Sequence, residues 1–330
     1  MTDSRLPVAV DAMGGDDAPA SIVAGARIAA EELGVPVLLV GDTDKLGDVG
    51  DLPVKHASEV IGMGDEPAAS VRTKKDSSVV RAAEAVRDGE ASACLSAGNT
   101  GAAMAASLLR LGRIRGISRP AIAVPFPVLG STPTTLLDCG ANADAQPEWL
   151  VQFAQLGAVY ARTRFGIEQP RVAVMTIGEE AGKGNALVKA ACDLLAEGSW
   201  TGACGATYVG NVEGRDLMAG VADVIVCDGF TGNIILKSVE GGVGIALDAI
   251  RTQLESIPGA NELLSDLYEE LDPEARGAAM LLGCKQVSVI SHGSSSPRAI
   301  ANAIRTSSEM VESGIVQRIR DMLEAEKATD

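Results

Sequence analysis

Short apolar runs alternate with segments of helical periodicity along almost the whole chain. The runs are rich in β-branched residues, as in residues 223–227 (DVIVC), and this is the pattern of strands buried on both faces of a sheet. Strands that alternate with helices of this length form βαβ units. The sequence therefore predicts an α/β fold, with a doubly wound, largely parallel sheet and helices on both of its faces.

The same patterns set the expected boundaries. Strands are predicted at residues 7–12, 35–40, 91–96, 120–127, 134–138, 171–177, 206–209, 223–227 and 287–291. Helices are predicted near 19–33, 77–88, 99–111, 147–165, 184–196, 233–256, 297–312 and 314–326. The sequence contains no internal repeat, low-complexity tract or flexible linker, so we expect a single large α/β domain over residues 1–330.

Charge and hydropathy narrow the class of protein. No run of about 18 uncharged apolar residues occurs, so no transmembrane helix is predicted. The N-terminus, MTDSRLPVAVDAMGG, lacks the basic and apolar regions of a signal peptide. The six cysteines form no CxxC pair and are expected to be reduced. The net charge of −16 argues against nucleic acid as a partner, and we expect a cytoplasmic protein.

Most predicted strand ends carry glycine beside Asn, Asp, Ser or Thr. The segments are DAMGGDDAP, SAGNTGA, DCGANAD, TIGEEAGKGN, VGNVEGRD, CDGFTGN and SHGSSSP. Ordinary turns and helix N-caps favour the same residues, and that interpretation stays open for each segment alone. Together they should lie at one edge of the sheet, where helix N-termini attract anions. We therefore interpret the glycine-rich joint at 228–233 as a phosphate-facing turn.

Two nucleotide sites are disfavoured. A dinucleotide fold would show GxGxxG after its first strand, where this chain has DAMGGDDAP. The segment GEEAGKGN differs from a P-loop in its glycine spacing, and Gly184 stands where the Ser or Thr should follow Lys183. Neither NAD nor ATP is expected.

Eight segments, read in order, resemble one known family. They are VAVDAMGGDDAP, KKDSSVV, SAGNTGA, LDCGANAD, IGEEAGKGN, VGNVEGRD, CDGFTGNIILKS and SHGSSSPRAIANAI, and the resemblance runs from about residue 7 to residue 312. The chain resembles the bacterial phosphate acyltransferases that begin phospholipid synthesis. The resemblance implies transfer of a long-chain acyl group from acyl carrier protein to inorganic phosphate. It also implies a homodimer and a fold similar to phosphotransacetylases and to isocitrate and isopropylmalate dehydrogenases.

The implied chemistry suits the residues. Bound phosphate can attack a thioester carbonyl directly, so no protein nucleophile is required. The reaction needs an oriented phosphate and donors for the developing oxyanion. It requires no cofactor, and although Glu179 and Glu180 could bind a metal, none is expected.

Site residues are assigned on the segments that carry the resemblance. Lys183 is the first choice for charge neutralisation, and the other predicted catalytic residues are Asn185, Asn233 and His292. The predicted substrate-binding residues are Asn99, Thr100, Asn142, Asn211, Gly229, Thr231 and Gly232. Structural roles stay open: both Asn185 and Asn211 could be N-caps, and His292 could be a hydrogen-bonded structural histidine.

Two segments are expected to meet partners. Acyl carrier proteins are acidic, so the basic cluster Arg110, Arg113, Arg115 and Arg119 is the predicted docking site, with Arg72, Lys74 and Lys75 as the alternative. Residues 250–284 resemble a helical tip near the dimer interface that touches membrane. The acidic residues of that tip predict only weak contact with the membrane, or with the downstream membrane-bound glycerol-3-phosphate acyltransferase.

Two other functions stay open. A phosphotransacetylase-like enzyme would use acyl-CoA, which shares the phosphopantetheine arm, and a donor comparison would distinguish it. A non-enzymatic scaffold that binds acyl carrier protein would not need polar glycine loops along the whole edge of the sheet.

Overall fold

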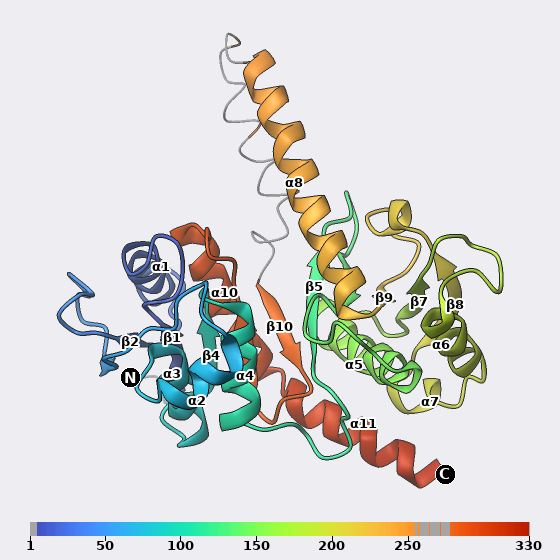
Figure 1. The fold of residues 1–330 in the computed structure, drawn as a ribbon, viewed down its shortest axis with the longest axis horizontal. Helices are drawn as coiled ribbons and strands as arrows, with labels where there is room; N and C mark the ends of the chain where they lie inside the picture. Colours follow the sequence, from blue (N-terminus) through green and yellow to red (C-terminus); the bar gives the residue numbers. More distant parts are fainter. Residues whose placement is uncertain (1–4, 255–256, 258–263, 265–270, 272–277, 330) are drawn as a thin grey trace. The chain divides into compact units, whose positions relative to one another are not determined.

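The computed structural model describes residues 5–329 except 255–256, 258–263, 265–270 and 272–277 (Figure 1). Internal contacts divide the chain into two compact units. Unit 1 comprises Met1–Pro120 and Gly277–Asp321, and unit 2 comprises Ala121–Arg276 and Met322–Asp330. The single large domain stays a prediction, and most of the predicted tip at 250–284 lies outside the described residues.

Unit 1 is built on a largely parallel sheet in the order β3-β2-β1-β4-β11-β10. Only β10 is antiparallel, pairing with β11. The strands are β1 (Val8–Asp11), β2 (Val37–Gly41), β3 (Val54–His56), β4 (Ala93–Ser96), β10 (Ala279–Leu282) and β11 (Val287–Ile290). β1, β4 and β11 are buried along their whole length, which explains why their sequences, VAVD, ACLS and VSVI, are mostly apolar.

Helices cover this sheet from both sides. Figure 1 shows α1 and α10 on one side of β1 and β4, with α2, α3 and α4 on the other. Their bounds are α1 (Ala20–Glu31), α2 (Pro67–Thr73), α3 (Ser78–Arg87), α4 (Thr100–Arg110) and α10 (Pro297–Glu312), and α11 (Ile315–Thr329) follows. The alanine-rich inner faces of α3 and α4 are buried because small side chains let these helices pack closely.

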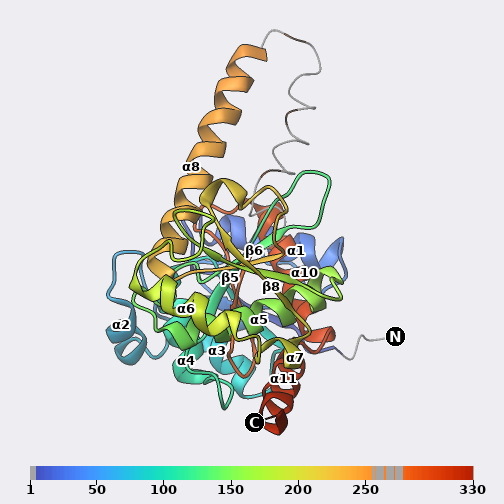
Figure 2. The ribbon, with the colours of Figure 1, turned by 90° about the vertical axis from the view of Figure 1, so that its right-hand side faces the viewer.

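Unit 2 has a second mostly parallel set of strands in the order β5-β6-β9-β7-β8. Only β5 runs antiparallel, against β6. The strands are β5 (Ala121–Phe126), β6 (Thr134–Leu137), β7 (Arg171–Met175), β8 (Thr207–Val212) and β9 (Val224–Val226). The helices are α5 (Pro147–Phe165), α6 (Ala186–Ala196), α7 (Thr201–Cys204) and α8 (Gly229–Leu254), with a 3-10 turn at Gly214–Asp216. α8 leaves β9 and extends away from the strands of its unit (Figures 1 and 2).

The predicted elements are present, with four differences. β3, β10, α2 and α7 have no counterpart among the predicted strands and helices. They are three to seven residues long and too short for a clear periodic signal. Two boundaries also differ: β8 continues to Val212, and α8 begins at Gly229 rather than at Asn233. All six cysteines are unpaired, as predicted, and five of them are buried.

Candidate functional site

The polar loops of each unit gather at the carboxyl ends of parallel strands. In unit 2, β6, β9, β7 and β8 are neighbours that run in one direction, so DCGANAD, CDGFTGN, TIGEEAGKGN and VGNVEGRD follow adjacent strand ends. In unit 1, DAMGG, SAGN and SHGSS follow the parallel strands β1, β4 and β11 in the same way. Within each unit, the loops therefore share one edge, where ligands of open α/β sheets bind.

Asp138 is the centre of the first loop in unit 2. Its side chain is fully buried at the end of β6. One carboxylate oxygen accepts from the N–H groups of Ile122 (2.9 Å) and Ala141 (3.0 Å). The other accepts from the backbone N–H (2.7 Å) and the side-chain amide (2.8 Å) of Asn142. Burial raises the pKa of Asp138, and these hydrogen bonds oppose the rise. The predicted donor Asn142 thus helps to hold the loop.

Two glycines place the first turn of α8 against this loop. A Cβ on Gly232 would lie 1.9 Å from the carbonyl oxygen of Asp138, and one on Gly229 would lie 2.7 Å from that of Asn142. Neither glycine has a positive φ. They are required for close packing of backbone on backbone, and the conformational freedom of glycine is not used here.

The segment at 228–233, for which the sequence predicted a phosphate-facing turn, is therefore a capped helix start. The carboxylate of Asp228 accepts from the N–H of Thr231 (2.8 Å) and from its hydroxyl (2.9 Å). The N–H of Gly229 donates to the Asn142 carbonyl, and that of Gly232 to the Asp228 carbonyl. These N–H groups already have acceptors, and the side chain of Asn233 on the same turn is a further possible anion donor. It is exposed and forms no hydrogen bond with the described part of the chain.

Gly140 lies beside that amide. It has φ +125°, a conformation that favours glycine, and a Cβ there would lie 3.5 Å from Oδ1 of Asn233. The two loops after β6 and β9 thus place Asn233 at the surface of the strand edge.

Side-chain hydrogen bonds connect the loop after β7 to the neighbouring strand β8. The amide of Asn211 donates to the Glu180 carbonyl (3.0 Å), and its oxygen accepts from the Cys192 thiol (3.2 Å). Asn211 was placed in a loop by the sequence pattern, but it lies in β8. Asn185 is the N-cap of α6, accepting from the N–H of Val188 at 2.9 Å. The N-cap role is therefore present at Asn185, and Asn211 connects β8 to the loop after β7 and to α6.

Lys183 projects from the loop after β7 with half of its side chain exposed. Its Nζ lies 4.0 Å from a Glu180 carboxylate oxygen. Nearby, Arg215 pairs with Glu179 at 3.0 Å and with Glu213 at 3.2 Å. The sequence analysis did not select Arg215, although the segment VGNVEGRD contains it. Exposed pairs of this kind are weak, so either cation can exchange its carboxylate for a bound anion.

In unit 1, Asn99 joins two loops. Its oxygen accepts from the N–H of Ala102 (3.0 Å) and caps α4. Its amide nitrogen lies 3.1–3.3 Å from the carbonyl oxygens of Gly62, Met63 and Asp65. The neighbouring Thr100 is exposed at the first position of the helix. Asn99 therefore secures the segment before α2.

His292 is exposed beyond β11. Its Nδ1 lies 2.7 Å from the hydroxyl of Ser294 in its own turn. This contact fits the structural role that the sequence left open, and it also leaves the ring accessible at the strand edge.

A buried acidic group at the end of β1 was missed. Asp11 is almost fully buried and accepts from the Ser96 hydroxyl (2.6 Å) and the N–H of Met13 (3.2 Å). The pKa of Asp11 is raised, because burial disfavours the charged carboxylate more than the hydrogen bonds from Ser78 and Ser96 stabilise it. A Cβ on Gly14 would lie 2.6 Å from Asp11 and 2.8 Å from the nitrogen of Gly98. A carboxylate ending an all-apolar strand, as in VAVDAMGG, is the sequence signal for such a group.

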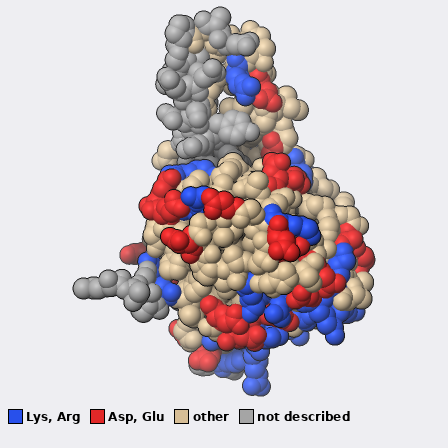
Figure 3. All heavy atoms as spheres, turned by 90° about the vertical axis from the view of Figure 1, so that its left-hand side faces the viewer, with Lys and Arg blue, Asp and Glu red and all other residues tan. Residues whose placement is uncertain are grey.

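The four arginines of the predicted docking cluster differ in burial. Arg110 is mostly buried and lies 3.0 Å from Glu84 of α3. Arg113 donates to the Ser118 carbonyl but is exposed, as are Arg115 and Arg119. Figure 3 shows basic side chains gathered toward the lower edge of one face. In the alternative cluster, the Nζ of Lys74 lies 2.6 Å from a carboxylate oxygen of Asp65 and forms an ion pair with it.

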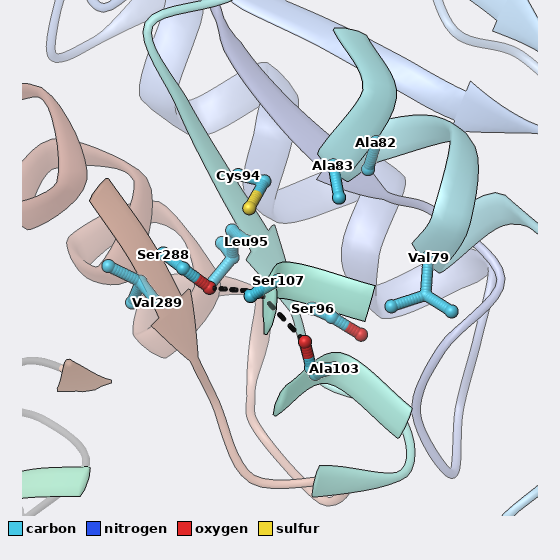
Figure 4. A pocket seen from close by; sticks show the side chains of 10 residues that line it. All are labelled: Val79, Ala82, Ala83, Cys94, Leu95, Ser96, Ala103, Ser107, Ser288 and Val289. Carbon is cyan, nitrogen blue, oxygen red and sulfur yellow. Dashed lines mark hydrogen bonds between the residues drawn. The ribbon is translucent and has the colours of Figure 1, made fainter. Parts of the chain in front are cut away.

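One small cavity lies inside unit 1 between α3, α4, β4 and β11 (Figure 4). Its volume is about 10 Å³, enough for about one water molecule. The hydroxyls of Ser107 and Ser288 meet beside it at 2.8 Å. It is far too small for an acyl substrate. Across the described residues, no group of three or more His, Cys, Asp or Glu side chains could hold a metal ion.

Comparisons with known proteins agree with the resemblance. The family model described as fatty acid synthesis protein matches residues 6–318. A phosphate acyltransferase of Desulforamulus reducens is 46% identical over 338 residues, covering 98% of this chain and 99% of that protein. The α/β fold is confirmed by a phosphotransacetylase from Streptococcus pyogenes (TM-score 0.62, 16% identity, 93% and 94% of the two chains). A branched-chain phosphotransacylase from Enterococcus faecalis shares it (TM-score 0.62, 17% identity, 93% and 99%). The chain therefore belongs to the phosphate acyltransferase family, and it is an acyltransferase.

Proposed function

We propose that the protein transfers a fatty acyl group from acyl carrier protein to inorganic phosphate, giving an acyl phosphate for phospholipid synthesis. The observation that supports this most directly is in unit 2. The loops after the neighbouring strands β9 and β7 carry an exposed amide, Asn233, and a half-exposed ammonium, Lys183. Neutral and cationic donors on adjacent loops suit a phosphate dianion and the oxyanion that forms during its attack.

In the proposed reaction, a phosphate oxygen attacks the thioester carbonyl carbon. The new C–O bond forms, the carbonyl oxygen becomes an oxyanion, and the C–S bond then breaks. The electron pair leaves with sulfur as a thiolate, which takes a proton from solvent. Since a simple thiol has a pKa of about 8.5, this departure needs only weak acid assistance. Lys183 neutralises charge, and Asn233 and Asn185 orient the reacting oxygens.

The remaining assignments are proposals about binding. Asn142, Asn211, Gly229, Thr231 and Gly232 shape the strand edge of unit 2, and their contacts make the loops rigid. Rigid loops favour catalysis because the donors need no reorganisation when charge develops. In unit 1, Asn99 and Thr100 are proposed to bind substrate at the start of α4.

The exposed residues Arg113, Arg115 and Arg119 are proposed to dock the acidic carrier protein, while Arg110 is already paired. We also propose a homodimer in the cytoplasm, with weak contact at the inner face of the membrane or with the downstream membrane-bound acyltransferase. None of the helices within the described ranges combines the length and hydropathy needed to span a bilayer.

Phosphate dependence is the decisive test. Purified protein mixed with long-chain acyl carrier protein should release the free carrier thiol only when phosphate is added, and NAD or ATP should have no effect. Thiol release at the same rate without phosphate would refute the proposal. Acyl-CoA should be tested in parallel, because a higher kcat/KM for acyl-CoA would favour the phosphotransacetylase-like alternative.

A further inference from the structure

Large apolar side chains are exposed beside the polar loops of unit 2. Ile177, directly beyond β7, is 81% exposed, and Phe230 and Ile234, in the first two turns of α8, are 63% and 49% exposed. Single exposed apolar residues are common and need no explanation. Three at one strand edge form an apolar area that the described chain does not cover, and such areas mark binding sites.

The topology places these three residues near one another. β7 and β9 are parallel neighbours, with Val174 opposite Val226. Ile177 lies three residues beyond Val174, and α8 begins three residues beyond Val226. Phe230 and Ile234 are four residues apart and therefore share one face of that helix. We call Ile177, Phe230 and Ile234 the apolar platform.

The platform lies on the same two segments as the polar donors, the loop after β7 and the start of α8. Asn233 is next to Ile234 in sequence, and Lys183 follows Ile177 in the loop after β7. In a thioester, the carbonyl carbon that phosphate attacks carries the alkyl chain directly. A site that holds phosphate at Asn233 and Lys183 must therefore receive the chain within a few bonds of those side chains.

We propose that the apolar platform binds the first part of the acyl chain and so favours donors whose chain is long enough to cover it. This inference rests on the proposed function, because it takes the strand edge of unit 2 as the phosphate site. Burying a methylene group in water-excluding contact improves binding about fourfold. kcat/KM should therefore rise with chain length while the chain extends over these side chains.

The test measures phosphate-dependent kcat/KM with carrier protein charged with acyl chains of 2, 4, 6, 8 and 16 carbons, because the shortest chains do not reach the platform and the longest cover it. The logarithm of kcat/KM should rise with chain length in the parent protein. In Phe230→Ala and in Ile234→Ser, the ratio between the longest and shortest donors should fall by about tenfold, the loss expected for one buried apolar side chain. Ile245→Ala is the matched control, because Ile245 is 75% exposed on the same helix, 15 residues beyond Phe230, and should keep the parent ratio.

Failure of this inference can be told apart from failure of the proposed function. If the parent protein shows no phosphate-dependent release with any donor, the proposed function itself is wrong, and the inference falls with it. If the parent is active but the variants keep its chain-length ratio, only the platform is refuted. If Phe230→Ala instead dissociates an oligomer in sedimentation and keeps the ratio, a second copy of the chain covers the platform, which also overturns the inference.

Discussion

Replacing Gly232 by alanine tests the close packing at the start of α8. In an exposed helical position, Gly→Ala stabilises a protein by about 1 kcal/mol, because alanine is the better helix former. At Gly232 the new methyl would lie 1.9 Å from the Asp138 carbonyl oxygen and 3.0 Å from the Cys227 sulfur. The first contact is with backbone, so the helix or the loop must move by more than 1 Å. Overpacking of this kind costs about 1–3 kcal/mol. With a cost near the upper value and the gain in helix propensity subtracted, we expect a net loss of about 2 kcal/mol.

The same helix supplies the control. Gly241 is exposed in α8, and nothing lies within 4 Å of the Cβ position there. Gly241→Ala should therefore leave the urea midpoint unchanged or raise it. Gly232→Ala should lower the midpoint and should also reduce kcat at saturating phosphate, because Asn233 moves with the turn. A Gly232→Ala protein as stable as Gly241→Ala would refute the packing described for this site.

Three further predictions address the charges. Lys183→Ala should raise the KM for phosphate by about tenfold, and Lys183→Arg should recover part of the loss, since one charge-assisted contact is removed and then restored; an unchanged KM would exclude Lys183 from the phosphate site. The Asp11 pKa is raised above 3.8 by burial, so ionisation opposes folding: thermal stability should fall as pH rises from 3.8 through the folded pKa, and this fall should be smaller in Asp11→Asn. An equal fall in both proteins would contradict that reasoning. Arg115→Glu should raise the KM for acyl carrier protein more than Arg110→Ala does, because Arg115 is exposed whereas Arg110 is paired with Glu84; the reverse order would move the docking surface elsewhere.

The fold class could be predicted because burial on both faces imposes a simple pattern. A strand such as Val224–Val226 is buried throughout, so all of its residues are apolar and the run is visible in the sequence. β3 could not be found in this way. None of its residues is buried, and its sequence, Val54–His56, has no apolar periodicity.

The site was only partly predictable, because polar residues near glycine serve loops and ligands alike. The pattern at 228–233 correctly located the end of a strand, but it could not show that the carboxylate of Asp228 caps the first turn of the helix. It also could not show why glycine is needed at 229 and 232. That reason depends on a loop about 90 residues away in sequence, which approaches the helix backbone at Asp138 and Asn142. Close approach between distant segments leaves no local signal.

The carboxylate of Asp228 caps the start of α8, and this affects how an anion would bind in unit 2. A free helix N-terminus would offer backbone N–H groups, but here Asp228 already accepts from the N–H of Thr231, and its negative charge repels phosphate. In the proposed phosphate site, the side-chain donors are Asn233 on this turn and Lys183 on the next loop. Lys183 lies near Glu180, and Arg215 is paired with Glu179 and Glu213, so acidic groups surround both cations. Binding phosphate therefore requires exchange of exposed ion pairs, each worth at most about 1 kcal/mol. The proposed site is therefore expected to bind phosphate with modest affinity.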